Sequence, residues 1–304
     1  MIRLFLLTSL FISLVGCGSS QKKTSNTNLS ESDEFDRIQN SDFNEPVQVP
    51  YRQSQDLFLS DSQEDSLSKE SVAKLPAPKL DNVNSEDVIN KALVKCYQGD
   101  SLKAFEIFDS VYRKYKKNPS YWNQIGTCYT LDGDNRKGLL YYNKSRDLKK
   151  NYAPPINNLG VLYQVEGKDQ KALAAYKEAN KIAPFAVTPR FNMAQLYLKY
   201  GLVEQAEEIF YNLYQKSRSD IDIISALGTI ELMRGNAKRA LSWYSKISKN
   251  NYSRFDIGTN LSIALLKSGR PSDANSVLGD VVVGNNEEHK RYYQKVSSYV
   301  SGAR

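Results

Sequence analysis

The stretch VEGKDQKALAAYKEANKIAP, residues 165–184, holds the features that decide the fold. It contains a glycine, then apolar residues at steps of three and four, and then a proline. Such steps are typical of a helix that buries one face. Gly167 stands where a preceding helix must stop, because glycine takes the left-handed backbone conformation without a Cβ clash. Pro184 closes the stretch, since proline cannot continue a helix.

The glycine belongs to a series with a period of 34 residues, and a fixed period of this length marks a repeat protein. The series is Gly99, Gly133, Gly167, Gly201, Gly235 and Gly269. Five positions after each glycine stands a small residue, at Ala104, Gly138, Ala172, Ala206, Ala240 and Ala274. Nine positions after it stands a large one, at Phe108, Tyr142, Tyr176, Phe210, Tyr244 and Leu278. Seven positions before it stands a second small one, at Ala92, Gly126, Gly160, Ala194, Gly228 and Ser262. These columns predict helix hairpins that approach closely at the small residues and pack on each other through the large ones.

The second and third repeats carry the fullest pattern. It runs Trp122, Ile125, Gly126, Tyr129, Gly133, Tyr142 in one, and Leu159, Gly160, Tyr163, Gly167, Ala172, Tyr176, Ala179, Pro184 in the other. The pattern closely resembles the tetratricopeptide repeat, over roughly residues 86–286. The resemblance implies an all-α superhelical solenoid of about six helix hairpins.

The ends of the repeat array depart from the pattern, as terminal units of a solenoid do. In the first repeat, Lys91 and Lys95 occupy positions that are apolar or aromatic elsewhere. After the sixth repeat, a helix at about residues 287–300 is predicted to cap the array. Its apolar stripe is Tyr292, Val296, Tyr299 and Val300.

Residues 1–16 have the pattern of a secretory signal peptide: Arg3, an apolar run from Leu4 to Val15, and a small residue. The run is shorter than the roughly 20 residues that span a bilayer. Leu14-Val15-Gly16-Cys17 resembles the bacterial lipobox, which implies that Cys17 is acylated, with palmitate among its possible chains, and begins the mature protein. The alternative is an ordinary signal peptide that contains a cysteine. By the same resemblance, Gly18 implies a lipid anchor in the outer membrane, facing the periplasm; a Gram-positive source, without that membrane, stays open.

Residues 17–85 comprise the expected lipidated cysteine and a linker rich in Ser, Asn, Gln, Asp and Glu. This composition predicts a disordered tether, because it cannot bury enough apolar surface to offset the entropy of ordering. The segment 22–85 has 7 basic and 12 acidic residues, while the whole chain has a net charge of +7. The repeat domain, residues 86–304, therefore carries a net charge of +11. Such a charge favours acidic proteins, anionic lipid or anionic polymers as partners, and nucleic acid is not expected for an exported chain.

Nothing in the sequence predicts catalysis, a metal or a cofactor. His289 is the one histidine, and neither a Cys/His cluster with metal-ligand spacing nor a GxSxG motif occurs. Cys96 and Cys128 stand at different positions of neighbouring first helices. This difference favours two buried thiols over a disulfide, although an oxidising compartment would permit the bond.

Binding is therefore the expected function, and the resemblance to the tetratricopeptide repeat implies which surface binds. In tetratricopeptide proteins the first helix of each hairpin lines a concave face. The corresponding groove positions are Asn123, Thr127, Asn157, Val161, Gln164, Phe191, Gln195, Leu198, Lys199, Ser225, Thr229 and Leu232. Amides, hydroxyls and apolar side chains of this kind suit a peptide segment or a subunit of an envelope protein. Asn158, Asn192 and Asn260 share a different column and are expected to join the helices. The convex face, with Tyr141 and Trp243, is the rival binding surface.

Three function classes follow. The first is a membrane-anchored interaction scaffold or assembly factor of the bacterial envelope, serving a secretin or pilus, a motility machine or an outer-membrane machine. The second is an adaptor that docks a periplasmic protease or hydrolase. The third is a binder of peptidoglycan or anionic polysaccharide. The first is favoured, although the long linker departs from the pilotins that such lipoproteins resemble.

Overall fold

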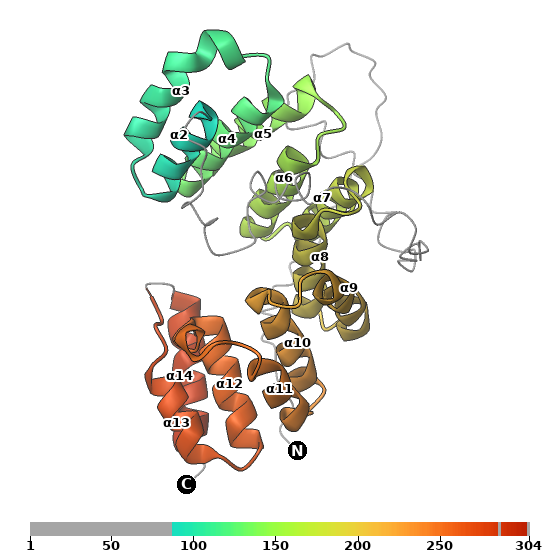
Figure 1. Cartoon of the computed structure of the whole chain (residues 1–304), viewed down its shortest axis with the longest axis vertical. Coiled ribbons are helices and arrows are strands. Elements are labelled where there is room, and N and C mark those ends of the chain that lie inside the picture. Colours follow the sequence, from blue (N-terminus) through green and yellow to red (C-terminus); the bar gives the residue numbers. More distant parts are fainter. Residues whose placement is uncertain (1–86, 285–286, 303–304) are drawn as a thin grey trace, which may run out of the picture. The chain divides into compact units, whose positions relative to one another are not determined.

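The structure, a computed structural model of the 304-residue chain, describes residues 87–284 and 287–302. These residues form 13 α-helices, one short 3-10 helix (Lys249–Asn251) and an isolated bridge between Arg254 and Val282 (Figure 1). The predicted all-α class is confirmed. The expected signal peptide, Cys17 and the linker lie outside the described residues.

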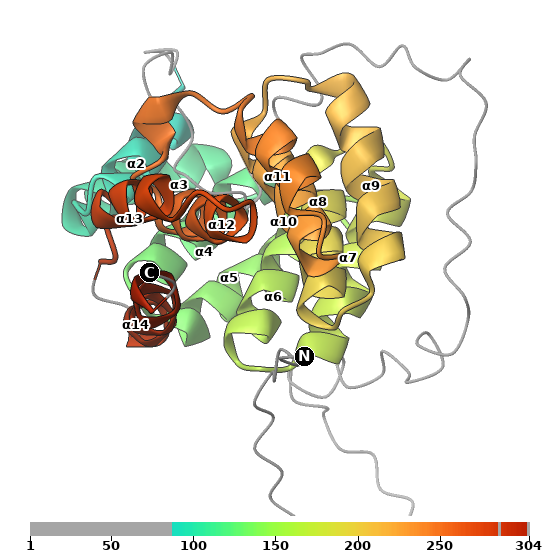
Figure 2. The same ribbon diagram turned by 90° about the horizontal axis from the view of Figure 1, so that it is seen from below.

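The helices alternate in hairpins. The first helices are α2 (Val88–Tyr97), α4 (Pro119–Leu131), α6 (Ala153–Val165), α8 (Val187–Lys199), α10 (Ile221–Met233) and α12 (Phe255–Lys267). The second helices are α3 (Ser101–Tyr115), α5 (Asn135–Leu148), α7 (Asp169–Ile182), α9 (Val203–Lys216), α11 (Ala237–Tyr244) and α13 (Pro271–Gly279). The last helix, α14 (Glu287–Ser301), packs on α12 and α13, as expected of a cap (Figure 2).

The glycine series ends the first helices, as the sequence predicts. Gly133 and Gly167 have φ angles of 88° and 73°, in the left-handed region. The amide after each turn, at Asp134 and Lys168, donates back to the carbonyl of Tyr129 and Tyr163, both at 2.8 Å. A Cβ on either glycine would meet no atom within 4 Å. The backbone conformation, and not lack of space, therefore requires glycine here.

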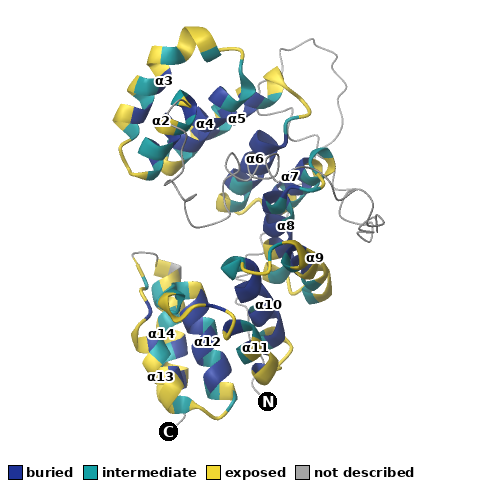
Figure 3. Ribbon diagram, in the orientation of Figure 1, coloured by how far each residue is buried: buried dark blue, intermediate teal, exposed yellow. Residues whose placement is uncertain are grey.

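The core lies between the two layers of helices. Figure 3 shows the first helices α6, α8 and α10 as mostly buried, and the second helices as buried along one face only. The large column packs into this core: Phe108, Tyr142, Tyr176, Phe210, Tyr244 and Leu278 are all buried. The second small column faces it, because a Cβ on Gly126 would lie 2.7 Å from Cδ1 of Tyr142.

The expectation that Cys96 and Cys128 are unpaired is wrong. The structure joins them in a disulfide, with Cα atoms 5.2 Å apart. The first helices α2 and α4 pack side by side, and their stagger brings two different helix positions opposite each other. Counting positions within each repeat missed this stagger.

Candidate binding surface on the first helices

The twelve predicted groove positions divide by exposure. Five are buried, at Asn123, Thr127, Asn157, Phe191 and Ser225. Five are half-buried, at Val161, Gln164, Leu198, Thr229 and Leu232. Two are exposed, at Gln195 and Lys199. Only the last seven present atoms to a partner in this structure.

Buried asparagines join the first helices to one another. Asn158 Nδ2 donates to Asn123 Oδ1 at 3.0 Å, which links α6 to α4. Asn192 Nδ2 donates to Asn157 Oδ1 at 3.0 Å, which links α8 to α6, and Asn157 bonds Asn158 at 3.1 Å. The predicted joining role of Asn158 and Asn192 is confirmed. Two predicted groove residues, Asn123 and Asn157, belong to the same series of hydrogen bonds between first helices.

Phe191 also serves the core. Its ring meets the buried ring of Phe210 edge-on, with centroids 5.3 Å apart and planes at 81°. Truncating Phe191 would leave a cavity at the α8–α9 interface, which costs several kcal/mol in a typical core. A binding test that alters Phe191 would therefore mix folding with recognition.

An exposed apolar row occupies the last residue of α4, α6 and α10. Leu131, Val165 and Met233 are 42%, 66% and 42% exposed. Lys199 and Lys267 hold the same position in α8 and α12 and are exposed as well. We call Leu131, Val165 and Met233 the apolar row. Leu131 and Val165 are not among the predicted groove positions, although the same 34-residue column that gave Lys199 contains both.

Lys199 is already engaged within the fold. Its Nζ lies 2.5 Å from Oδ2 of Asp169, at the start of α7, and the Tyr200 hydroxyl donates to the same oxygen at 2.7 Å. The bond to Asp169 raises the pKa of Tyr200. This contact fixes α8 against α7 beside the apolar row. The ammonium of Lys199 is therefore already paired with a carboxylate before any partner arrives.

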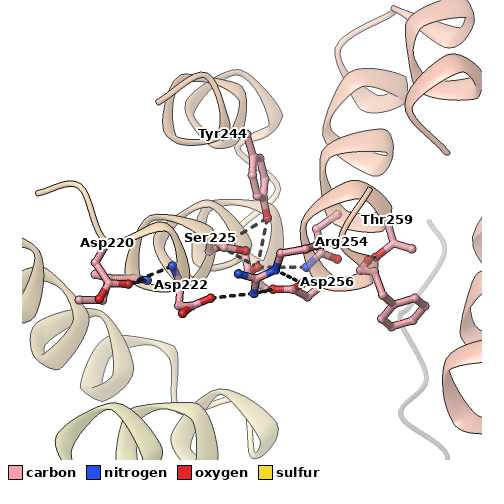
Figure 4. Close-up of polar contacts among 11 residues, drawn as sticks. Asp220, Asp222, Ser225, Tyr244, Arg254, Asp256 and Thr259 are labelled. Atoms are coloured by element: carbon pink, nitrogen blue, oxygen red, sulfur yellow. Dashed lines mark hydrogen bonds and ion pairs between the residues drawn. The ribbon is translucent and has the colours of Figure 1, made fainter. Parts of the chain in front are cut away.

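At the α10–α12 junction the polar side chains are also used internally (Figure 4). Arg254 NH2 donates to Asp222 Oδ1 at 2.7 Å and to Asp256 Oδ2 at 2.9 Å. The Tyr244 hydroxyl lies 3.1 Å from Oγ1 of Thr229, and burial raises the pKa of Tyr244. The Arg254–Asp222 bond holds the start of α12 against α10. The Tyr244–Thr229 contact joins α11 to α10 and occupies one of the predicted groove hydroxyls.

The cap helix α14 covers part of the last first helix. The ring of His289 stacks on Phe255 with centroids 4.1 Å apart, and the Tyr292 hydroxyl donates to Asn260 Oδ1 at 3.4 Å. Asn260 Nδ2 in turn donates to Thr229 Oγ1 at 3.1 Å, so the third predicted joining asparagine also bonds the preceding hairpin. The cap therefore occupies part of the first-helix surface of α12.

Within residues 87–284 and 287–302, no three His, Cys, Asp or Glu side chains gather as metal ligands would. None of the helices in this part of the chain is both long and apolar enough to cross a membrane.

No protein-family model and no curated protein matches the sequence. Solved structures do match. The Cut9–Hcn1 hetero-tetramer of the APC/C gives a TM-score of 0.59 at 15% identity over 74% of this chain and 43% of that one. The chain thus spans less than half the length of that relative. PilW, a widely conserved type IV pilus biogenesis factor, gives 0.55 at 15% identity over 71% and 100%.

A tetratricopeptide repeat protein from Parabacteroides merdae gives a TM-score of 0.53 at 18% identity, over 78% of this chain and 91% of that one. At such identities the likeness shows the fold alone. The described residues therefore have the fold of tetratricopeptide repeat structures, as the sequence resemblance implied.

Proposed function

We propose that this protein is a lipid-anchored interaction scaffold, an assembly factor of a bacterial envelope machine, and that the first-helix surface around the apolar row binds its partner. The observation that carries the proposal is the row itself. Three large apolar side chains recur at one position of three first helices, and each remains at least 42% exposed. Exposed apolar groups in register give a partner segment its anchors.

The partner that fits is a peptide segment or subunit with apolar side chains and acidic flanks. Gln164 and Gln195 are groove positions with solvent-exposed atoms, and the NH2 groups of their amides can bond a peptide backbone, while Gln164 Oε1 accepts from the Tyr176 hydroxyl. The repeat domain carries a net charge of +11, which attracts acidic flanks. The likeness of the fold to PilW, a pilus biogenesis factor, supports an assembly role.

Attachment to the membrane through Cys17 is the second part of the proposal, with the outer membrane, facing the periplasm, as the site. The lipobox-like sequence before Cys17 supports it. The disulfide between Cys96 and Cys128 fits an oxidising compartment outside the cytoplasm. Cys17→Ser should move the protein from the membrane fraction to the soluble envelope fraction. A protein whose membrane fraction is unchanged by Cys17→Ser would contradict lipidation.

The binding test places a photo-crosslinking amino acid at position 165 of the full-length chain in living cells. The crosslinked protein is identified and its binding is repeated with purified components. Leu131→Gln, Val165→Gln and Met233→Gln together should weaken that binding at least tenfold. The matched control is Leu140→Gln with Tyr211→Gln, which alters residues 47% and 50% exposed on the second helices.

If the apolar-row variant binds as tightly as the control variant, the contact lies elsewhere on the protein. If both variants lose binding to the same extent, the binding reflects non-specific association of exposed apolar groups. If cells that lack this protein lose an enzyme's activity on its substrates but keep their other envelope proteins, the adaptor class is favoured instead.

A further inference from the structure

Four aromatic rings form a continuous stack where α3, α4 and α5 meet. Trp122 stacks on Tyr141 with centroids 5.6 Å apart and planes at 9°. Tyr141 stacks on Tyr129 at 5.3 Å and 7°, and Tyr129 on Phe105 at 4.3 Å and 30°. Tyr112 meets Trp122 edge-on at 6.2 Å. We call these five residues the aromatic stack; all remain partly exposed, Tyr112 at 45%.

Trp122 and Tyr129 stand at positions of the repeat pattern itself, but the continuous stack is not shared by the following repeats. At the position of Trp122 the next three repeats have Ile156, Arg190 and Ile224. At the position of Tyr141 the next two have Ala175 and Ile209, which are buried. Those repeats form the same hairpins without the stack. A stack that the following repeats lack, and that keeps large apolar rings partly in contact with solvent, indicates a binding role.

Positive charge accompanies the stack. Residues 101–150 include 11 basic and 5 acidic side chains, so about half of the net charge of the repeat domain lies here. Lys144 Nζ lies 5.7 Å from the Trp122 ring centroid, and Lys137 Nζ lies 4.8 Å from that of Tyr129. Lys137 also pairs with Asp134 at 3.2 Å, whereas Lys144 has no ion pair with any residue that the structure describes. Cations thus stand beside flat apolar rings.

We propose that the aromatic stack and its lysines bind anionic polysaccharide. The C–H faces of a sugar ring are flat and apolar and pack on aromatic rings, and its acid groups pair with ammonium groups. A neutral sugar would leave the lysines without a partner, and an acidic peptide would leave the rings without matching flat faces. Single-stranded nucleic acid also stacks on aromatic side chains, but the signal-peptide pattern predicts an exported chain. This site uses other residues than the apolar row and does not rest on the proposed scaffold role.

The chain carries its own comparison site three repeats further on. Tyr214, Trp243 and Lys246 stand at the positions of Tyr112, Tyr141 and Lys144. Tyr214 and Trp243 meet edge-on at 5.0 Å, and Lys246 Nζ lies 5.2 Å from the Trp243 centroid. The rest of the stack is missing there, since Ile224 and Glu231 replace Trp122 and Tyr129. This second site should bind much more weakly.

The chain has two tryptophans, one at each site, and this allows each to be observed alone. In the full-length chain, Trp243→Phe leaves Trp122 as the single reporter, and Trp122→Phe leaves Trp243. Fluorescence is followed during titration with polygalacturonate (sugar and charge), dextran (sugar only), polyglutamate (charge only) and single-stranded DNA. We expect polygalacturonate to change Trp122 emission in a saturable way and added salt to reverse the change. The apparent affinity reported by Trp243 should be at least tenfold lower.

Two substitutions confirm the contact residues. Lys144→Glu in the Trp243→Phe chain should raise the apparent Kd for polygalacturonate about tenfold, because an attractive charge becomes repulsive. Lys295→Glu makes the same charge change on the exposed face of α14 and should leave the Kd within about twofold. Tyr141→Leu removes a ring without changing charge and should also weaken binding, with circular dichroism confirming that each variant is folded.

If polyglutamate changes Trp122 emission as strongly as polygalacturonate does, the site binds acidic peptides and the proposal is overturned. An equal response to single-stranded DNA would overturn it in favour of nucleic acid. Equal responses of Trp122 and Trp243, or no response to polygalacturonate, would also reject it.

Discussion

A Cβ on Gly160 would lie 2.7 Å from Cε1 of Tyr176, so the tyrosine ring fills the space that any side chain at position 160 would need. The same pairing recurs in other repeats, and the type of large residue matches the type of small one. Wherever the large residue is tyrosine, its partner sixteen positions earlier is glycine, as in Gly126–Tyr142 and Gly228–Tyr244. Wherever it is phenylalanine, the partner is alanine: Ala92 with Phe108 and Ala194 with Phe210. The tyrosine hydroxyls explain the difference, because they bond the facing first helix, Tyr176 to Gln164 Oε1 at 2.8 Å, and so hold the ring close.

We expect Gly160→Ala to lower the free energy of unfolding by about 1–3 kcal/mol through overpacking, despite the better helix propensity of alanine. Tyr176→Phe should restore part of this loss, because the ring is no longer held by Gln164 and can shift, as in Ala194–Phe210. Urea unfolding of both single variants and the double variant gives the coupling energy. Strictly additive effects would contradict the explanation.

Replacing two buried amide side chains, Asn157 and Gln124, should change the free energy of unfolding in opposite directions. Asn157→Ala leaves Asn192 Nδ2 and Asn158 Oδ1 without this partner and should cost about 1–3 kcal/mol of stability. Gln124 is 1% exposed, and neither of its side-chain polar atoms has a hydrogen-bond partner among the residues that the structure describes. Gln124→Met keeps the volume and removes the buried polar group, so it should raise the free energy of unfolding by about 1 kcal/mol. Chemical denaturation measures both, and a destabilised Gln124→Met would show that the amide is solvated.

The disulfide should stabilise the first two hairpins. Cys96 and Cys128 are 32 residues apart, and closing a loop of this length is worth about 3–4 kcal/mol in the chain-entropy account. Reduction, or Cys96→Ala with Cys128→Ala, should therefore lower the melting temperature. Non-reducing mass spectrometry tests the bond directly. Two free thiols in protein purified without reductant would contradict it.

Alkaline pH should unfold the domain. Burial raises the pKa of Tyr142, Tyr176 and Tyr244, and that of Tyr97 to about 12, from the ordinary 10.0. A group whose pKa is higher in the folded state contributes stability that is complete below its unfolded pKa and is lost as pH rises through its folded pKa. Helicity should thus be constant up to about pH 10 and then fall.

Phenylalanine already occupies the same column at positions 108 and 210, which makes it the natural control. Tyr142→Phe, Tyr176→Phe and Tyr244→Phe together should move the alkaline midpoint, followed by circular dichroism, to higher pH. An unchanged midpoint would assign alkaline unfolding to other groups.

The sequence by itself determined the hairpins, because helix period and left-handed glycines are local properties. The run around Gly167 sufficed to place a helix end, and its recurrence every 34 residues placed the rest. The lipobox-like Cys17 is likewise a matter of local sequence, and its lipidation stays a prediction.

Only the tertiary structure decided which side chains meet solvent. Asn158 meets Asn123, 35 residues earlier, and Cys96 meets Cys128 across 32. Neither separation equals the repeat, because adjacent helices pack with a stagger that depends on all the side chains between them. Packing of adjacent first helices buried Asn123 and Asn157 and left Val165 exposed, whereas packing within one hairpin brought Trp122 of α4 onto Tyr141 of α5. Periodicity specifies which residues are equivalent, whereas contacts between helices distant in sequence decide what each one touches.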